Sequence, residues 1–217
     1  MAGRKNPLDI FLSLLYYILY YNFFMADLHI FDDFYSDVDE VRQMALNMDF
    51  SVEGNYPGYR TAPVENEDVK NAIGNLIRPF AGEIVDWNKT KYNSAFQYTT
   101  AEDRSWVHAD KYNTWAGVLY LTPNAPLSGG TGIFRHKATG LMKVPYLENG
   151  EMDLETLNKI EDEGIDPTKW EIVDRIGNVY NRLVLYKGDF FHTSLDYFGT
   201  DRYDGRLFQT FFFSSEY

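Results

Sequence analysis

The chain has 217 residues, of which 45% are hydrophobic and 24% charged, which suits one globular domain with a buried core and excludes an intrinsically disordered chain. Its formal net charge of −12 argues against a nucleic-acid partner, because an acidic surface repels phosphate groups. Cysteine is absent, so disulfides, thiolate catalysis, iron–sulfur clusters and cysteine-rich zinc sites are excluded.

The first segment, residues 1–24, combines a basic start with an apolar run and so resembles a signal peptide or a short membrane anchor. Asp9 lies at the start of that run, and the run is shorter than the ~20 residues that a spanning helix needs. Two expectations follow. A chain that begins at Met1 is membrane-associated, whereas a true start at Met25 gives a cytoplasmic protein with a single domain over 25–217.

The next part of the chain is expected to supply flanking helices. Alternation over 28–31 indicates a short strand. Asp37, with a glutamate three residues later, forms a capping box for a helix that ends near Met48. After a turn at 57–59, apolar residues at helical spacing predict a second helix over 68–80. The apolar stripes of both helices are expected to brace a sheet.

From residue 92 onward the pattern changes to period two, with many aromatic and β-branched residues. A polar insertion over about 137–177 interrupts it, contains an acidic helix at 154–163, and is either a solvated loop or a lid. Because the strands do not alternate with helices, we expect a mainly antiparallel β sandwich. The predicted strands are 94–100, 106–109, 114–121, 132–135, 182–186, 189–193 and 207–213.

A set of metal-binding side chains stands out in this β-rich part. His108 and Asp110 are two residues apart, so on a strand they point to the same side and can converge on one ion, and His192 follows far downstream. Two imidazoles and one carboxylate occupy one face of Fe(II) and leave positions open for substrate and O₂. Arg206 comes later and offers a planar, permanently charged fork for a carboxylate.

This order of residues resembles the Fe(II)- and 2-oxoglutarate-dependent dioxygenases, and in particular their prolyl-4-hydroxylase-like branch of phage and bacterial type. The neighbouring sequence also matches the family. It contains WAGVLYL after His108 and Asp110, GGTGIF in the following loop and strand, and NRLVLYKGDFFHTS around His192. The resemblance covers about 94–213. It implies a mainly β fold with flanking helices around a double-stranded β-helix core, also called a jelly roll or cupin-like barrel.

The resemblance also implies the chemistry. Fe(II), O₂ and 2-oxoglutarate would be the cofactors, and hydroxylation of a substrate would accompany oxidative decarboxylation of 2-oxoglutarate to succinate. His108, Asp110 and His192 would be the metal ligands and catalytic residues. Arg206 would bind the distal carboxylate of 2-oxoglutarate, and Arg202 is its nearest alternative.

One position departs from the family pattern. The family often places a Ser or Thr two residues after the arginine, and here that residue is Phe208. A hydroxyl group for 2-oxoglutarate must then come from elsewhere. The resemblance points to Tyr98, and Tyr120 on the next inward strand is the rival.

Residues around the motif carry further expectations. Trp106 and Trp115 are expected to line the pocket. Asp189 and Thr193 either orient the imidazoles through hydrogen bonds or, as such residues more often do, only form turns. His136 is expected on the surface or in the lid rather than among the ligands.

Two other functions fit the same residues. One is a cupin-like metalloenzyme that does not use 2-oxoglutarate and therefore does not need Arg206. The other is a non-catalytic β-barrel binding module or virion component tethered by residues 1–24. For the dioxygenase, the expected partner is a small-molecule or peptide substrate such as peptidyl proline, a free amino acid, a metabolite or a sugar.

Overall fold

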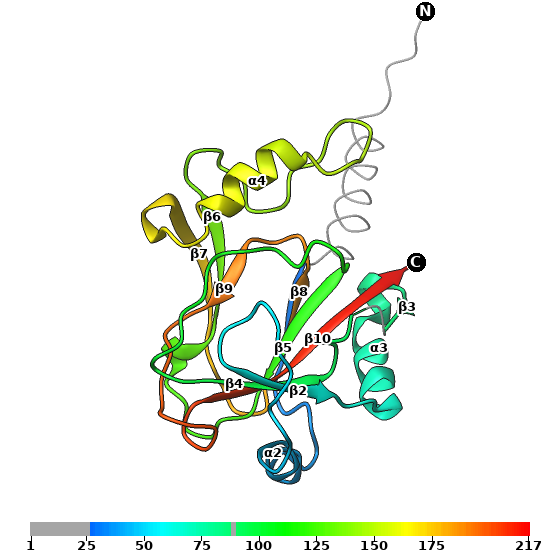
Figure 1. The fold of residues 1–217 in the computed structure, drawn as a ribbon. Helices are drawn as coiled ribbons and strands as arrows, with labels where there is room; N and C mark the ends of the chain where they lie inside the picture. Colours follow the sequence, from blue (N-terminus) through cyan, green and yellow to red (C-terminus); the bar gives the residue numbers. More distant parts are fainter. Residues whose placement is uncertain (1–26, 88–89) are drawn as a thin grey trace, which may run out of the picture.

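Two antiparallel sheets face each other in this computed structural model, which describes residues 27–87 and 90–217 (Figure 1). The predicted N-terminal segment, residues 1–24, lies outside the described residues. In the described ranges, no helix is long and apolar enough to cross a membrane.

The larger sheet has the strand order β1-β8-β5-β10-β4-β2, and β3 pairs with the far end of β10. The smaller sheet has the order β7-β6-β9. The strands are β1 (Leu28–Phe31), β2 (Tyr59–Pro63), β3 (Glu83–Asp86), β4 (Ala95–Thr99), β5 (Trp115–Tyr120), β6 (Thr131–His136), β7 (Trp170–Ile176), β8 (Leu183–Lys187), β9 (His192–Ser194) and β10 (Arg206–Glu216).

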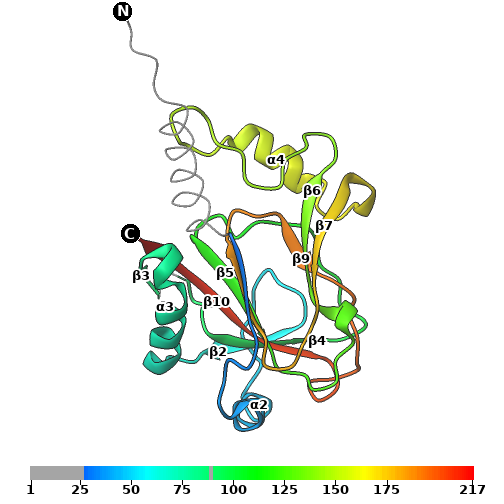
Figure 2. The ribbon, with the colours of Figure 1, turned by 180° about the vertical axis from the view of Figure 1, so that it is seen from behind.

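Helices α2 (Val38–Leu46) and α3 (Glu67–Ala81) cover the outer face of the larger sheet, as predicted (Figures 1 and 2). The side chain of Asp37 caps α2, and that of Asn66 caps α3. Their apolar stripes pack against outward-facing strand residues. This outer core includes Ala45, Leu46, Val69, Ile73, Ile77, Phe96, Trp115, Leu119, Leu185, Phe211 and Phe213.

Side chains alternate between the two faces of the larger sheet, and this alternation decides what reaches the interior. On β5, Trp115 and Leu119 face the helices, whereas Ala116, Val118 and Tyr120 face the smaller sheet. Ile133 and Ile176 of the smaller sheet pack against that inner face. The inner faces of the two sheets therefore enclose the space in which a site can form.

The insertion is more structured than the sequence indicated. It contains α4 (Leu154–Asp162), the 3₁₀ turn η3 (Pro167–Lys169) and β7, which pairs with β6 along its length. Leu157 and Ile160 of α4 are fully buried in a third apolar cluster, with Trp170 and Phe191. The β7 strand was missed because its exposed side carries charged residues, which is typical of an edge strand.

Side-chain contacts of the half-exposed Glu163 with His136 and Lys169 fasten this region. His136 Nε2 lies 2.7 Å from Glu163 Oε2, and Lys169 Nζ lies 3.2 Å from Glu163 Oε1. His136 is thus engaged away from the metal-binding side chains, as expected, but it is a buried residue of β6 and not a surface residue. That the insertion acts as a lid stays a prediction.

The predicted strand at 106–109 is wrong. Its backbone groups bind different partners, because Val107 N donates to Gly164 O whereas His108 pairs with His192. The segment is a loop with one β-bridge at His108. Likewise β9 begins only at His192, since Phe190 N donates to Lys187 O in a turn.

Candidate active site

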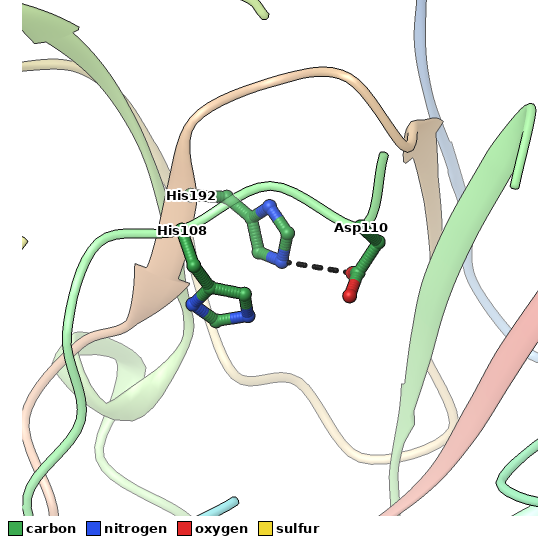
Figure 3. Close-up of side chains that lie close together, drawn as sticks. All are labelled: His108, Asp110 and His192. Atoms are coloured by element: carbon green, nitrogen blue, oxygen red, sulfur yellow. Dashed lines mark ion pairs between the residues drawn. The ribbon is translucent and has the colours of Figure 1, made fainter. Parts of the chain in front are cut away.

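Three side chains converge at one end of the space between the sheets (Figure 3). His108, Asp110 and His192 each offer a ligand atom, and these atoms lie within 4.8 Å of one another. The Nε2 atom of His192 is 3.2 Å from Oδ2 of Asp110, and the two imidazole rings are 4.5 Å apart between centroids. The sequence pattern therefore identified three groups that the fold brings together.

Backbone pairing holds the two histidines side by side. His108 N donates to His192 O at 3.0 Å, and His192 N donates to His108 O at 2.8 Å. This antiparallel bridge joins the loop before β5 to the first residue of β9. Asp110 follows two residues after His108, in the turn that Asn113 N closes by donating to Asp110 O.

A close approach fixes that turn. A methyl group on Gly188 would lie 2.3 Å from the Asn113 carbonyl oxygen and 2.7 Å from that of Asp110. Only glycine allows the β8–β9 turn to pack against the Asp110 turn at this distance. Gly188, which precedes His192 in the sequence, thus helps to position the Asp110 carboxylate.

Main-chain carbonyls orient both imidazoles. His108 Nδ1 lies 2.9 Å from Trp106 O, and His192 Nδ1 lies 2.9 Å from Phe190 O. A carbonyl oxygen only accepts, so each Nδ1 carries the proton and each Nε2 presents its lone pair. Of the two alternatives for Asp189 and Thr193, orientation of the rings is wrong, because the carbonyls two residues before each histidine do so.

The electrostatic environment suits a cation. Removal from bulk water lowers the pKa of His108, and the neighbouring His192 lowers it further, so the ring is neutral at pH 7. Burial acts to raise the pKa of Asp110, but the contact with the His192 ring 3.2 Å away outweighs it and holds that pKa below its ordinary 3.8. Two imidazoles and one carboxylate, without sulfur, are a donor set that fits Fe(II).

A cavity of about 790 Å³ opens from these ligands into the space between the sheets. Its deeper wall holds Arg206, the first residue of β10, whose side chain is 1% exposed. Arg206 Nε donates to Gly129 O at 2.9 Å, and Nη2 lies 3.4 Å from Gly130 O. Its Nη1 is buried and has no hydrogen-bond partner among the described residues.

The guanidinium of Arg206 is further packed between aromatic rings. It lies 4.3 Å from the centroid of the Phe208 ring and 5.3 Å from that of Tyr120. A buried cation with an unused donor is costly unless a ligand completes it. Arg206 therefore fits an anionic group inside the cavity, whereas Arg202 lies outside it, over the rings of Phe50 and Tyr98.

The two candidate tyrosines have different positions. Tyr120 is fully buried behind the cavity wall, where its hydroxyl is 2.7 Å from Thr131 Oγ1. Tyr98 lies on the helix-facing side of β4, packed against Phe50 and Tyr59, so the structure does not bring it to the site. Strand alternation explains this, since its neighbour Gln97 lines the cavity instead.

Sequence reasoning missed a third tyrosine. Tyr186 on β8 lines the cavity, and its ring lies 4.6 Å from that of His192 between centroids. Burial raises the pKa of Tyr186 well above 10.0, as does the charge of Asp110, so its hydroxyl is a donor at neutral pH. The alternation of β8, with Val184 and Tyr186 facing inward, was a usable signal for it.

The two tryptophans differ in the same way. Trp106 lines the cavity as expected, and its ring lies 5.6 Å from that of His108. Trp115 points to the opposite face, where its Nε1 donates to Ser215 Oγ at 2.9 Å. The prediction that Trp115 walls the pocket is therefore wrong.

Charged residues near the cavity mouth were also missed. Arg60 of β2 and Lys111 line the cavity, as does Glu161, which α4 contributes from the insertion. Lys111 Nζ lies 2.7 and 2.8 Å from the two carboxylate oxygens of Glu161. No motif marks Arg60 or Glu161, because β2 was not predicted and nothing in the sequence of the insertion shows which of its residues reach the ligands. Lys111 directly follows Asp110, but its residue type does not belong to the ligand pattern.

Solved structures with the same fold belong to Fe(II)/2-oxoglutarate oxygenases. A prolyl hydroxylase from Trichoplax adhaerens, in complex with a hypoxia inducible factor peptide fragment, is 15% identical over 96% of this chain and 93% of that chain, with a TM-score of 0.51. HygX from Streptomyces hygroscopicus, with nickel, 2-oxoglutarate and hygromycin B bound, is 12% identical over 91% and 86%, with a TM-score of 0.56.

A third example extends this group. SnoN, a non-haem α-ketoglutarate-dependent epimerase from nogalamycin biosynthesis, is 14% identical over 94% of this chain and 82% of that chain, with a TM-score of 0.53. These likenesses confirm the predicted double-stranded β-helix fold with flanking helices.

Comparison by sequence adds the family. None of the curated proteins matches this chain. The model of a family of unknown function, DUF6445, matches residues 24–213, which include the whole site and nearly all of both sheets. The chain therefore belongs to the DUF6445 family, and its fold is that of the Fe(II)/2-oxoglutarate oxygenases.

Proposed function

We propose that this protein is an Fe(II)- and 2-oxoglutarate-dependent dioxygenase that hydroxylates a small-molecule or peptide substrate. The observation that carries the proposal is the presence of two complementary features in one cavity. A facial set of His108, Asp110 and His192 lies at one place, and Arg206 with a buried unused donor lies at another. A metal-chelating dicarboxylate needs both.

The metal would be held by Nε2 of each imidazole and by the Asp110 carboxylate. When bound, Fe(II) supplies the redox chemistry by which O₂ oxidises 2-oxoglutarate to succinate and carbon dioxide and the substrate to its hydroxylated product. The protein contributes binding, orientation and exclusion of water. Because Nδ1 of each histidine donates to a carbonyl, neither ring can turn away from the metal position.

Arg206 would hold the distal carboxylate of 2-oxoglutarate through Nη1. The hydroxyl groups of Thr131, Ser194 and Tyr186 line the same cavity and offer further donors. They take the place of the Ser or Thr that Phe208 replaces. Tyr120 supports this arrangement indirectly, by binding Thr131 and packing on Arg206.

Apolar side chains would keep the reacting groups dry. Val118, Phe208 and Phe212 line the inner part of the cavity, and Trp106 lies beside His108. Excluding water from this space would limit side reactions of the reacting groups. The solved structure of HygX holds hygromycin B and that of the Trichoplax enzyme holds a peptide fragment, which supports a small molecule or a peptide as the substrate class here.

The test is an assay of succinate release from 2-oxoglutarate by the purified protein, with and without Fe(II), over a panel of amino acids, peptides and sugars. We expect release only with Fe(II), and we expect His108→Ala to abolish it. Glu155→Gln is the control, since Glu155 forms only an exposed pair with Lys159 and should leave release unchanged. Equal succinate release by His108→Ala and the wild type would reject the proposal.

A cupin-like metalloenzyme that does not use 2-oxoglutarate is the second candidate. It is favoured by the metal ligands alone and does not use Arg206. Calorimetric titration of the Mn(II)-loaded protein with 2-oxoglutarate separates the two. Binding that depends on Arg206 supports the dioxygenase, and absence of binding supports the alternative.

A further inference from the structure

A second buried arginine lies at the same cavity as the metal-binding side chains. Arg60 of β2 is 6% exposed and lines the cavity together with His108, Asp110 and Arg206. The strand register places Arg60 opposite Gln97 of β4, on the strand whose Thr99 pairs with Arg206. The two arginines thus extend into one cavity from strands on either side of β4.

Neutral groups hold the Arg60 side chain. Its Nε and Nη2 both donate to Oε1 of Gln97, the former at 2.9 Å. Gln97 is itself fixed, because its Nε2 donates to Pro57 O at 2.6 Å. The guanidinium carbon lies 3.8 Å from the centroid of the Tyr56 ring and 4.9 Å from that of Tyr92.

The rings of Tyr56 and Tyr92 are held in place by contacts with each other and with the backbone. Tyr56 and Tyr92 meet edge to face at 5.6 Å, and the Tyr56 hydroxyl donates to Val52 O. Gly54 makes room for them, since a methyl group there would lie 2.4 Å from the Tyr56 ring and 2.6 Å from the Tyr92 hydroxyl. The position of Arg60 is therefore set by the fold before any ligand arrives.

No anionic group of the described residues pairs with the Arg60 guanidinium. In residues 27–87 and 90–217, Arg60 forms no ion pair within 4.0 Å, and no hydrogen bond engages its Nη1. Burial lowers the pKa of Arg60 to about 10, and the charges of Tyr56 and Asp110 oppose this only in part. Buried charges are normally paired, so an unpaired one that faces a cavity points to an anionic ligand.

The cosubstrate does not account for this second cation. One carboxylate of 2-oxoglutarate belongs at the metal, and the other is met by Nη1 of Arg206, which lies deeper. An anion for Arg60 must then come from the other reactant. The rings of Tyr56 and Tyr92 next to Arg60, and that of Trp106 on the same cavity wall as His108, provide apolar contact for the body of that molecule.

We infer that Arg60 binds a carboxylate of the substrate, which is therefore an organic acid with an apolar or aromatic body, and this inference rests on the proposed function. Arg60 is a specificity-determining residue in this account. It holds the acid by Nη1 while Gln97 keeps the guanidinium plane in place. Sugars and amides without an anionic group are excluded as good substrates.

The experiment uses the full chain loaded with Mn(II) and 2-oxoglutarate, which cannot turn over. Two probes of the same shape, 3-phenylpropanoate and its uncharged amide, are titrated, and binding is followed by calorimetry. We expect the acid to bind at least about tenfold more tightly than the amide, as a charge-assisted hydrogen bond predicts. Arg60→Met should abolish the difference while leaving the 2-oxoglutarate affinity within about twofold.

Two further variants, Arg202→Met and Arg60→Lys, serve as controls for the acid preference. Arg202→Met removes an arginine outside the cavity and should preserve the acid preference. If Arg60→Met does not fold, Arg60→Lys should retain a reduced preference. Equal binding of acid and amide by the wild type, or no binding of either, overturns the inference, as does a tenfold loss of 2-oxoglutarate affinity in Arg60→Met.

Failure of the proposed function has a separate signature. If the wild-type protein with Mn(II) does not bind 2-oxoglutarate at all, the dioxygenase proposal fails. The acid and amide comparison on the Mn(II) protein then still decides the role of Arg60.

Discussion

His108 and His192 are joined by two reciprocal backbone hydrogen bonds, and each imidazole is also held by the carbonyl oxygen two residues before it. Four hydrogen bonds therefore fix the two rings without any help from a metal. The ligand set is a product of folding and does not have to be assembled by the ion. This separates the site from small zinc domains, in which the metal itself drives folding.

Metal removal should accordingly leave the fold intact. We expect the chelator-treated protein to keep its far-ultraviolet circular dichroism and a cooperative melting transition. Added Mn(II) should raise stability by mass action, by about 2.7 kcal/mol at a concentration 100-fold above its Kd. Thermal melting at increasing Mn(II) measures this, and His108→Ala should melt without Mn(II) dependence. Collapse of the circular dichroism on chelation would contradict a preformed site.

Replacing Arg206 by lysine should weaken 2-oxoglutarate binding and spare the metal. Lysine keeps the charge but cannot bind the Gly129 and Gly130 carbonyls and a carboxylate together. We expect a 10- to 100-fold loss of affinity for 2-oxoglutarate, on the order of the ~1.5–3 kcal/mol of a charged hydrogen bond. Calorimetry on the Mn(II) protein measures both ligands, with Arg202→Lys as the matched control. An unchanged 2-oxoglutarate affinity would contradict the role of Arg206 in binding 2-oxoglutarate.

Glu161 should anchor α4 over the cavity mouth. Its carboxylate accepts from Lys111, which directly follows the ligand Asp110, and both side chains are largely buried. Glu161→Gln should speed amide hydrogen exchange in α4 roughly two- to fivefold, as expected for a loss of ~0.5–1 kcal/mol.

The same helix supplies the control for this experiment. Glu155 pairs with Lys159 at 2.8 Å, but both side chains are exposed. Glu155→Gln should therefore leave the exchange rates unchanged. Equal acceleration by both variants would show that the Lys111 contact has no special role, and would remove the support for a lid.

Glu163 should make stability depend on pH in the acid range. The hydrogen bond from His136, followed by that from Lys169, lowers the pKa of Glu163 below its ordinary 4.5. A carboxyl group with a lowered folded-state pKa stabilises the protein above its unfolded pKa, and this contribution is lost as pH falls through the folded value. The wild type should therefore be more stable than Glu163→Gln at neutral pH, by an amount that shrinks below pH 4.5.

Urea unfolding at a series of pH values measures this difference. Glu155→Gln serves again as the exposed control, with no pH-dependent loss expected from a solvated pair. A stability difference between Glu163→Gln and the wild type that is constant from neutral to acid pH would contradict the assignment.

The metal ligands could be predicted because their chemistry is written in residue type and order. The pattern consists of three side chains that can ligate a metal, His108, Asp110 and His192, and one that can bind a carboxylate, Arg206. The fold brings all four to one cavity. The flanking helices were equally readable, since apolar spacing and the Asp37 cap are local signals.

The face that a strand residue occupies was harder to predict. Tyr98 and Trp115 were placed in the pocket, but each lies one residue out of phase with the inward side of its strand. A shift of one position moves a side chain to the other face of a sheet, and sequence alone did not fix that phase. Arg60 escaped notice for a related reason, because its strand lies after a turn and has little apolar alternation.

The buried arginines also affect how fast ligands reach the cavity. Arg60 and Arg206 lie inside a protein whose overall charge is −12, so a dianion meets repulsion far from the surface and attraction only within the cavity. Screening length falls from ~30 Å at 0.01 M salt to ~10 Å at 0.1 M, which weakens the distant repulsion more than the contact inside. Moderate salt should therefore accelerate 2-oxoglutarate association, opposite to enzymes that steer anions with a basic exterior.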